Sequence, residues 1–346
     1  MNAKVWFLIL ALLLPAQLRA QGFAGLGGEA DGFDVPQLGY QLSFPQDHGP
    51  HPTFKIEWWY LTANLKGEDG RDYGVQWTLF RSALKPYEEQ SWQSPQLWLG
   101  HAALTTPVAH YFAERLSRGG IGQAGVTATP FEAWIDEWYM RGTDFNALKI
   151  RANGSEFGYD LSMRATGPLV FHGDAGYSVK STQGQASHYY SQPFFDLTGT
   201  VHLPDGDVAV TGQGWLDREW SSQPLAEDQS GWDWFSLSFE GGDKLMAFRL
   251  RGEAEDFTSA TWIGKDGETT ALADGSVSFE PLQTAHVADR DIPIEWRVTL
   301  PARGVDIVVS ALTPKAWMAT RFAYWEGPVT VSGSHSGRGY LEMTGY

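Results

Sequence analysis

The sequence has no cysteine among its 346 residues. Disulfide bonds, thiolate metal sites, a cysteine nucleophile and a lipid-modified N-terminal cysteine are therefore excluded. The chain also lacks a His-Glu-x-x-His zinc motif and a Gly-x-x-x-x-Gly-Lys phosphate loop. Its nine histidines are scattered along the chain, so we expect neither a metal site nor a cofactor.

Basic residues are scarce as well. The chain has 25 Lys and Arg against 41 Asp and Glu, a formal net charge of −16. Nucleic acids and anionic membrane surfaces attract clustered basic side chains, so we expect neither as a partner.

One long apolar run stands at the N-terminus, where residues 5–14 follow Lys4 and precede a short polar stretch ending at Ala20. A run of ten is too short for the roughly 30 Å hydrocarbon core, which takes about 20 helical residues. The pattern predicts a signal peptide over residues 1–20, cleaved after Ala20. A buried N-terminal helix is the weaker alternative, because nothing caps the run and Gly-rich sequence follows. Cleavage removes Lys4 and Arg19 and no acidic residue, so −16 becomes −18. We expect a periplasmic or secreted mature chain without a membrane span.

Helix-forming patterns are few beyond this point. One short helix is predicted over residues 108–117, ending before Gly119 and Gly120. Residues 173–191, rich in Gly, Ser and Gln, are expected to form a long loop. Short segments with strand-like composition, separated by Gly, Asp or Pro, predict strands over residues 56–65, 73–81, 97–105, 131–141, 145–153, 159–166, 195–203, 207–220, 232–240, 244–251, 258–264, 292–300, 306–312 and 329–346. Many strands with short turns indicate an all-β sandwich or barrel.

Aromatic residues are abundant: 16 Trp, 13 Tyr and 19 Phe make up 14% of the chain, beside 39 Gly. This composition suits β-barrels, in which large rings fill the interior and glycines serve the turns. Two interpretations stay open. The rings form a large core, or they line a pocket for a long apolar ligand such as a lipid or isoprenoid.

The order carboxylate, Trp, strand, hairpin, Phe, Arg occurs twice in the chain. It opens at Glu57-Trp58 and ends at Phe80-Arg81, and then opens at Asp233-Trp234 and ends at Phe248-Arg249. The repetition suggests two related antiparallel barrels side by side, although hairpins are common and coincidence is the alternative. The polar stretch 221–230 is the expected boundary, with an N-terminal domain over 21–224 and a C-terminal domain over 225–346.

The first Trp-rich segment is Glu57-Trp58-Trp59-Tyr60. On a strand, Glu57 and Trp59 share one face, and Trp58 and Tyr60 share the other. Both faces are then aromatic, as in a strand buried on both sides. The Glu57 carboxylate is either paired with an arginine, such as Arg81 on the return strand, or kept protonated. We favour the ion pair and a structural role.

The second segment runs from Gly214 to Trp220. Trp215, Asp217 and Glu219 fall on one strand face, with the carboxylates about 7 Å apart. Close carboxylates in an apolar setting raise one pKa, which leaves a proton donor beside a charged base. Such a pair can protonate an alkene while indole faces stabilise the developing cation. An ion-pair lattice with Arg218 and Arg249 is an equal alternative.

The candidate site residues follow from these two segments and the nearby Trp232-Asp233-Trp234. The candidate catalytic residues are Asp217 as proton donor, with Glu219 or Asp233 as its partner. The candidate ligand-binding residues are Trp58, Trp59, Tyr60, Trp215, Trp220, Trp232 and Trp234.

The same segments carry a family resemblance. The chain resembles the carotenoid 1,2-hydratase (CrtC) and AttH superfamily at residues 57–60 (Glu-Trp-Trp-Tyr), 214–220 (Gly-Trp-Leu-Asp-Arg-Glu-Trp), 324–329 (Tyr-Trp-Glu-Gly-Pro-Val) and 339–346 (Gly-Tyr-Leu-Glu-Met-Thr-Gly-Tyr). The resemblance implies two lipocalin-like antiparallel β-barrels side by side with little helix. With its signal peptide, the chain is most similar to the exported members, which are associated with an ABC-type lipoprotein exporter and often described as secreted hydrolases.

The resemblance implies a mechanism for the hydratases of this superfamily. In them, an aspartate with neighbouring His, Trp and Tyr protonates an isoprenoid double bond, and water then captures the cation. Asp217, with Trp220 beside it, matches that region. Leu216 and Arg218 stand where the hydratase motif has histidines, which argues against carotenoid hydration itself. The leading hypothesis is an exported protein that binds a lipid or isoprenoid. The alternatives are a hydratase or secreted hydrolase with Asp217 as general acid, and a non-catalytic accessory of an ABC-type exporter.

Overall fold

The computed structural model describes residues 30–223 and 225–346. The predicted signal peptide lies outside the described residues. Within these ranges the chain is all-β, with two short 3₁₀ helices, η3 (Gln46–His48) and η4 (Pro301–Arg303). None of the helices in this part of the chain has the length and apolar character that a membrane span requires. The all-β prediction is confirmed.

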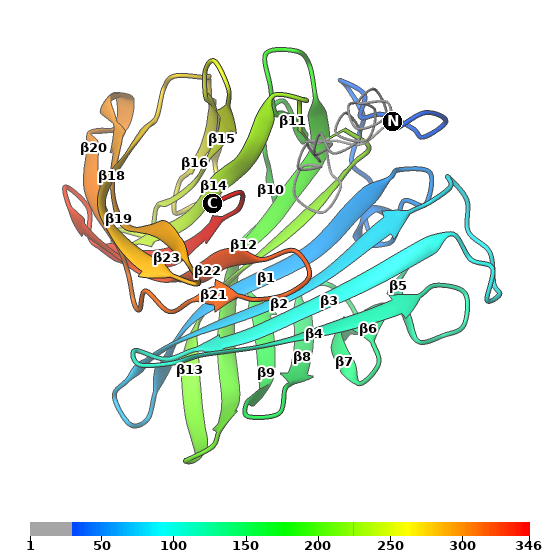
Figure 1. Ribbon diagram of the computed structural model, residues 1–346, viewed down its shortest axis with the longest axis horizontal. Coiled ribbons are helices and arrows are strands. Elements are labelled where there is room, and N and C mark those ends of the chain that lie inside the picture. The colour runs from blue at the N-terminus through cyan, green and yellow to red at the C-terminus, as the bar shows by residue number, and fades with distance from the viewer. Residues whose placement is uncertain (1–29, 224) are drawn as a thin grey trace, which may run out of the picture.

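The first sheet is antiparallel and nearly closes on itself (Figure 1). It contains β1 (Ile56–Gly67), β2 (Asp72–Ala83), β3 (Gln96–Thr105), β4 (His110–Arg118), β5 (Ala124–Ala128), β6 (Phe131–Ile135), β7 (Trp138–Gly142), β8 (Ala147–Asn153), β9 (Gly158–Ala165), β10 (Val170–Phe171), β11 (Tyr177–Val179), β12 (Ala186–Leu203) and β13 (Gly206–Ser221). The strand order is β4-β3-β2-β1-β13-β12-β9-β8-β7-β6-β5, with β10 and β11 also paired to β12. Strand β4 at one end contacts β6 near the other, which brings the two ends of the sheet together.

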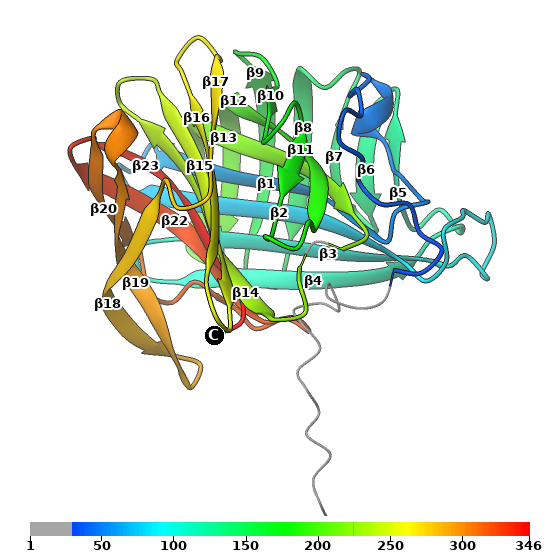
Figure 2. The ribbon, with the colours of Figure 1, turned by 90° about the horizontal axis from the view of Figure 1, so that it is seen from above.

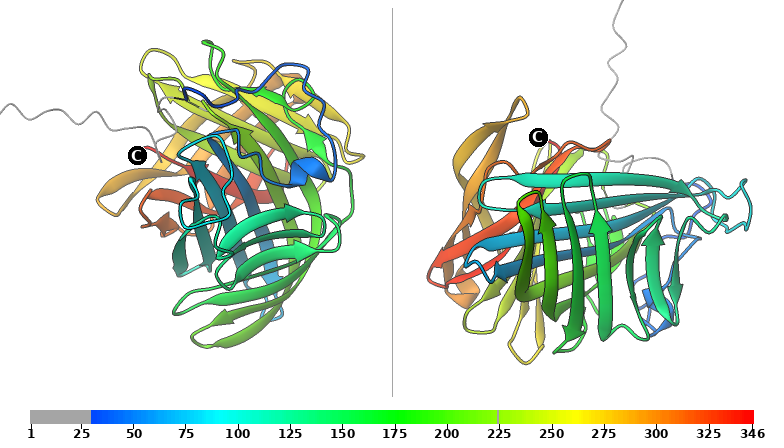
Figure 3. Two further views of the ribbon diagram at one scale, coloured as in Figure 1. Left: turned by 90° about the vertical axis from the view of Figure 1, so that its right-hand side faces the viewer. Right: turned by 90° about the horizontal axis from the view of Figure 1, so that it is seen from below.

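The second sheet is antiparallel too and curls into a half-barrel beside the first (Figure 2). It contains β14 (Gln229–Phe239), β15 (Lys244–Gly252), β16 (Phe257–Ile263), β17 (Thr269–Leu272), β18 (Ser278–Val287), β19 (Arg290–Leu300), β20 (Val305–Ala311), β21 (Trp317–Met318), β22 (Tyr324–Gly333) and β23 (Gly337–Met343). Its order is β17-β16-β15-β14-β23-β22-β20-β19-β18, with β21 on β22. Figure 3 shows this sheet lying against one side of the first. The prediction of two antiparallel barrels side by side is confirmed in this form.

Strand periodicity explains the core of the first sheet. In β8, Leu148, Ile150 and Ala152 are buried while their neighbours face outward. This alternation is what a strand with one apolar face requires. The interior also holds several fully buried indoles, among them Trp59, Trp77, Trp138 and Trp220.

Strand β1 differs because it is buried on both faces. Trp59 and Leu61 point into the core of the first sheet. Tyr60 and Trp58 point the other way, into a separate apolar cluster that includes Trp234 and Phe248 of the second sheet. The aromatic character of both faces, predicted from residues 57–60, therefore arises because the two sheets pack together along β1.

The sequence repeat has the same register in both sheets. Across β1 and β2, Glu57 pairs with Arg81 and Trp58 with Phe80. The corresponding pairs across β14 and β15 are Asp233 with Arg249 and Trp234 with Phe248. Each carboxylate is ion-paired with the arginine opposite it. The repeat is thus a structural one.

Four local predictions were wrong. Residues 329–346 do not form one strand: β22 ends at Gly333, the chain reverses, and β23 pairs back against it. Residues 108–117 do not form a helix, because β4 pairs along its length with β3, and this pairing outweighs the helix propensity of the segment. Residues 131–141 form two strands, β6 and β7, since the chain turns at Asp136, where φ is 52°. Residues 173–191 are not one loop: they contain β11, and the long strand β12 begins at Ala186.

Candidate active site between the two sheets

A pocket of about 850 Å³, a figure that includes its open mouth, lies where the two sheets meet. Its apolar wall combines the two halves of the repeat, since Trp58 and Phe80 come from the first sheet and Trp234 and Phe248 from the second. Leu225 and Leu250 extend this wall. One amine and three carboxyl groups interrupt it, those of Lys180, Asp217, Glu219 and Glu342.

Asp217 lies on β13 and is buried in the pocket wall. Its Oδ1 accepts hydrogen bonds from the Ser191 hydroxyl and from Trp215 Nε1 at 2.8 Å. Its Oδ2 accepts one from the Tyr189 hydroxyl at 3.0 Å. Burial raises the pKa of Asp217 to about 7, although these hydrogen bonds act in the opposite direction. Because Oδ1 already takes two donors, the acid form carries its proton on Oδ2.

A chain of hydrogen bonds supports Asp217 from behind. Ser191 Oγ lies 2.6 Å from His172 Nε2, and His172 Nδ1 lies 2.9 Å from Thr261 Oγ1 on β16. Since Ser191 donates its proton to Asp217, it accepts from Nε2, and Nδ1 then accepts from Thr261. Burial lowers the pKa of His172 well below its ordinary value, so the ring is neutral. The chain links the second sheet to the carboxyl group of the first.

Tyr189 connects Asp217 with the pocket. Its hydroxyl donates to Asp217 and accepts a hydrogen bond from Trp234 Nε1 at 3.1 Å. Burial raises the pKa of Tyr189 well above its ordinary value, which keeps the phenol protonated. When Asp217 carries its proton on Oδ2, that proton can pass to the phenol oxygen while the phenol proton turns toward the pocket.

Glu219 stands two residues beyond Asp217 but has a different environment. Its carboxylate forms an ion pair with Lys180 Nζ at 2.8 Å and accepts a hydrogen bond from the Ser187 hydroxyl. The Lys180 ammonium also lies over the rings of Tyr189 and Phe248, 4.8 and 4.3 Å from their centroids. Glu219 is thus an ion-paired carboxylate beside Asp217, which has no cation as a partner among the residues that the structure describes.

The alternative interpretation paired Asp217 and Glu219 with Arg218 and Arg249. In the structure these two arginines pair with other carboxylates. Arg218 points to the opposite face of β13, where it contacts Glu57 at 3.2 Å. Arg249 pairs with Asp233 at 2.7 Å. Neither arginine reaches Asp217 or Glu219 in the part of the chain that the structure describes.

Four predicted ligand-binding residues, Trp58, Tyr60, Trp232 and Trp234, line the pocket. Trp215 lies next to it and acts through its hydrogen bond to Asp217. The other predicted aromatic residues lie elsewhere: Trp59 belongs to the core of the first sheet, and Trp220 stacks on His51 at 3.9 Å between centroids.

Asp233 is separated from the pocket. It is fully buried between Arg249 at 2.7 Å, Arg251 at 2.6 Å and the Tyr346 hydroxyl at 2.8 Å. A carboxylate with two arginines and a phenol has no free lone pair to direct at a ligand. The structure therefore brings Asp217 and Glu219 together and holds Asp233 apart from them.

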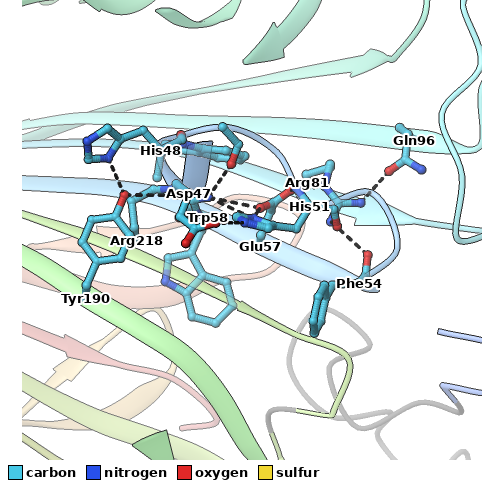
Figure 4. Close-up of polar contacts among 12 residues, drawn as sticks. Asp47, His48, His51, Phe54, Glu57, Trp58, Arg81, Gln96, Tyr190 and Arg218 are labelled. Atoms are coloured by element: carbon cyan, nitrogen blue, oxygen red, sulfur yellow. Dashed lines mark hydrogen bonds and ion pairs between the residues drawn. The ribbon is translucent and has the colours of Figure 1, made fainter. Parts of the chain in front are cut away.

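Figure 4 shows the polar contacts of the Glu57 cluster. Neither Glu57 nor its partners Arg81, Arg218 and His51 line the pocket. Glu57 accepts from Arg81 Nε, from Arg218 at 3.2 Å and from the His51 backbone at 2.8 Å. Burial alone would raise the pKa of Glu57, but Arg81, His51 and Arg218 outweigh it and hold the pKa below its ordinary value. His51 also contacts Asp47 at 3.2 Å, so the cluster fastens the segment before β1 to the sheet. The predicted ion pair of Glu57 with Arg81 is confirmed.

Sequence reasoning missed several residues of the site. Lys180, Tyr189 and Ser191 fall in the segment expected to be a loop, and no motif marks them. Tyr189 and Ser191 reach the site because β12 pairs with β13, which sets Ser191 opposite Asp217, and Lys180 follows β11, which pairs with β12. Glu342 and Tyr324 could have been proposed as site residues from the sequence, since both belong to segments that carry the family resemblance. Among the described residues, no cluster of three or more His, Asp or Glu could hold a metal ion.

The sequence matches the AttH-like family over residues 35–346. The chain belongs to the AttH-like family. A crystal structure from Nitrosomonas europaea, described as a candidate AttH, is similar to it with a TM-score of 0.83 and 33% identity, covering 91% of this chain and 99% of that one. The comparison with curated proteins gave no match.

Two more distant crystal structures share the fold of this AttH-like protein. Kievitone hydratase from Nectria haematococca has a TM-score of 0.68 and 16% identity, covering 90% of this chain and 96% of that one. The protein CghA has a TM-score of 0.51 and 14% identity, covering 92% and 97%. At these identities the likeness concerns the fold alone.

Proposed function

We propose that this AttH-like protein binds a long apolar ligand, a lipid or isoprenoid, between its two sheets and adds water to one of its double bonds. One observation carries the proposal: a carboxyl group without a cation, Asp217, stands in the wall of an aromatic pocket. Burial raises its pKa to about 7, so it can donate a proton near neutral pH.

The chemistry follows from the positions of these groups. Asp217 delivers its proton, directly or through the Tyr189 hydroxyl, to one carbon of the double bond. The π bond breaks, a C–H bond forms, and the second carbon becomes cationic. The indole faces of Trp58 and Trp234 stabilise this charge. A water molecule then forms the C–O bond and releases its extra proton to a base in the pocket. Atoms and charge balance as the addition of one water molecule.

Two observations support hydration over simple carriage. A carrier of apolar ligands needs no hydrogen-bonded acid in the wall of its pocket. Here Asp217 is oriented by the Tyr189 hydroxyl and by a chain of hydrogen bonds that runs through Ser191, His172 and Thr261. In addition, one protein of the same fold is named a hydratase. Carriage without chemistry remains the second candidate, because the same aromatic pocket suits it.

Location and partners remain predictions from the sequence. The signal peptide predicts a periplasmic or secreted chain of the exported AttH branch, and the resemblance suggests an ABC-type envelope exporter nearby. In that compartment, envelope lipids and polyprenoids are the apolar molecules that the pocket would meet. Secreted hydrolysis uses the same acid and predicts bond cleavage instead of addition.

The test is to incubate the protein with farnesol, squalene and oleic acid in ¹⁸O-labelled water and to follow products by mass spectrometry. We expect a product heavier by one labelled water molecule. Leu250→Trp, which fills the pocket, should abolish the product, whereas Leu282→Trp at an exposed position should not. Farnesyl acetate, which carries an ester bond, is the probe for hydrolysis: cleavage to farnesol and labelled acetate would indicate that reaction. Binding of these probes without any labelled product would overturn hydration and leave carriage.

A further inference from the structure

Two glutamates of the second sheet face each other at the pocket. Glu326 on β22 and Glu342 on β23 are direct cross-strand partners. Glu326 is 1% exposed, and Glu342 lines the pocket. Like charges directly opposite each other on neighbouring strands repel, and burial in an apolar setting increases the cost. Both groups therefore cannot be ionised at once without compensation.

The compensation is not a cation. Within the described residues, neither glutamate has a Lys, Arg or His among the groups that act on it. Their partners are neutral hydrogen-bond donors. The Tyr60 hydroxyl donates to Glu326 Oε1 at 2.5 Å, and Trp232 Nε1 donates to Glu342 Oε1 at 2.6 Å. Two carboxyl groups that face each other with neutral donors alone are expected to share at least one proton.

The repeat shows why Glu342 differs from Glu219. In the first sheet Trp58 pairs with Glu219, and in the second Trp234 pairs with Glu342. The two glutamates hold equivalent positions and both line the pocket. Glu219 is neutralised by Lys180, whereas Glu342 has a second carboxyl group in place of a cation. The two halves of the repeat therefore offer an ion pair on one wall and a proton-exchanging pair on the other.

We propose that Glu326 and Glu342 form the second proton-transfer site of the pocket, in which Glu326 retains a proton and Glu342 accepts the proton that water releases. The inference rests on the proposed function and supplies its missing base. Asp217 loses a proton to the substrate carbon, and Glu342 gains one from the attacking water. The proton returns from Glu342 to Asp217 through solvent after product leaves, which completes the cycle.

The acidities of the two groups agree with these roles. Burial raises the pKa of both, that of Glu326 well above its ordinary value and that of Glu342 to about 7. A base is most effective when its pKa lies near the working pH. Glu326 then stays protonated while Glu342 changes its charge near neutrality. The donor and the base stand on different sheets, with the substrate between them.

A substrate-free measurement tests the pair on its own. Infrared spectra of Asp217→Asn at about pH 8 should contain the carbonyl band of one buried protonated carboxyl group, and adding Glu326→Gln should remove it. Adding Glu219→Gln instead, at the equivalent position of the first sheet, should leave the band in place. Absence of the band in Asp217→Asn, or its persistence with Glu326→Gln, would overturn the protonated pair.

Kinetics test the role of the base. Glu342→Gln should lower kcat about 100-fold, leave the ligand Kd unchanged and remove the acidic limb of the pH–rate profile. Glu280→Gln, at an exposed position of β18 in the same sheet, should keep both limbs. If Glu342→Gln keeps its rate and both limbs while Asp217→Asn is inactive, Glu342 is not the base although the proposed function stands. A wild-type protein that hydrates nothing would instead overturn the proposed function, and the infrared result would still decide whether the pair holds a proton.

Discussion

At the residue scale, the fate of each carboxylate depends on the side chain opposite it. Glu57 and Asp233 each face an arginine across the hairpin and become ion-paired. Asp217 has Tyr60 on one side and Ser191 on the other, and stays without a cation. The hairpin partner Arg81 could be predicted from the sequence because it lies a short turn away. The position of Ser191 opposite Asp217 could not be predicted, because the segment that contains Ser191 was expected to be a loop and is a strand.

Asp217 should make the stability of the protein pH-dependent. Its pKa is raised from 3.8 to about 7, so the folded chain keeps a proton that the unfolded chain loses. This contribution is fully present below about pH 4 and is lost as the pH rises to about 7. Asp217→Asn does not titrate. The wild-type free energy of unfolding, measured by urea titration, should therefore fall relative to the variant by about 4 kcal/mol over this range. A constant difference would show that Asp217 is ionised throughout.

At the element scale, the two hairpins of the repeat explain why the sequence reveals the fold well and the site only partly. The alternation of side chains, the turn residues and the order of carboxylate and arginine are all confined to one hairpin, so each of them can be recognised in the sequence. The segment now known as β4 has mixed composition, and only its pairing with β3 makes it a strand. Contacts between strands that are distant in the chain, such as β12 with β13, left no comparable local pattern.

The buried ion pair in the first hairpin should be far more sensitive to substitution than the exposed one. Arg81→Met leaves Glu57 buried and short of a partner, which should cost about 3–5 kcal/mol of unfolding free energy. Lys66→Met breaks an exposed pair with Asp72 in the same hairpin and should cost less than about 1 kcal/mol. Equal losses in chemical denaturation would contradict the structural role of the Glu57 cluster.

At the scale of the whole molecule, the site exists only where the two sheets meet. The Trp-rich segments of both sheets are recognisable in the sequence, but nothing in their local pattern specifies how one sheet is oriented against the other. The burial of β1 on both faces is the local sign of that contact. Glycine at position 74 is a second sign, because it lets β2 approach the second sheet closely.

Gly74→Ala should weaken the contact between the sheets. An added Cβ would lie 2.5 Å from Pro328 Cγ and 2.7 Å from the Tyr340 hydroxyl oxygen, both in the second sheet. Overpacking of this kind should cost about 1–3 kcal/mol in thermal or chemical unfolding and should reduce ligand affinity. Gly241→Ala is the matched control, since nothing lies within 4 Å of its Cβ. A stable Gly74→Ala variant would argue against close packing at this point.

The signal peptide predicted from the sequence gives an expected N-terminus for the mature protein. Expression of the full reading frame in a bacterium should yield a chain that begins at Gln21, because cleavage is expected after Ala20. Intact mass and N-terminal sequencing of the periplasmic or secreted fraction measure this directly. Recovery of an uncleaved chain in the cytoplasm would exclude an envelope role.

The central claim is that Asp217 is the proton donor of a ligand pocket between the sheets. The most direct measurement determines ligand Kd by tryptophan fluorescence and hydration rate by labelled water on the same samples of wild type and Asp217→Asn. The account predicts an unchanged Kd and a rate reduced at least about 100-fold. An Asp217→Asn variant that is folded, binds the ligand and still hydrates it at the wild-type rate would contradict the claim.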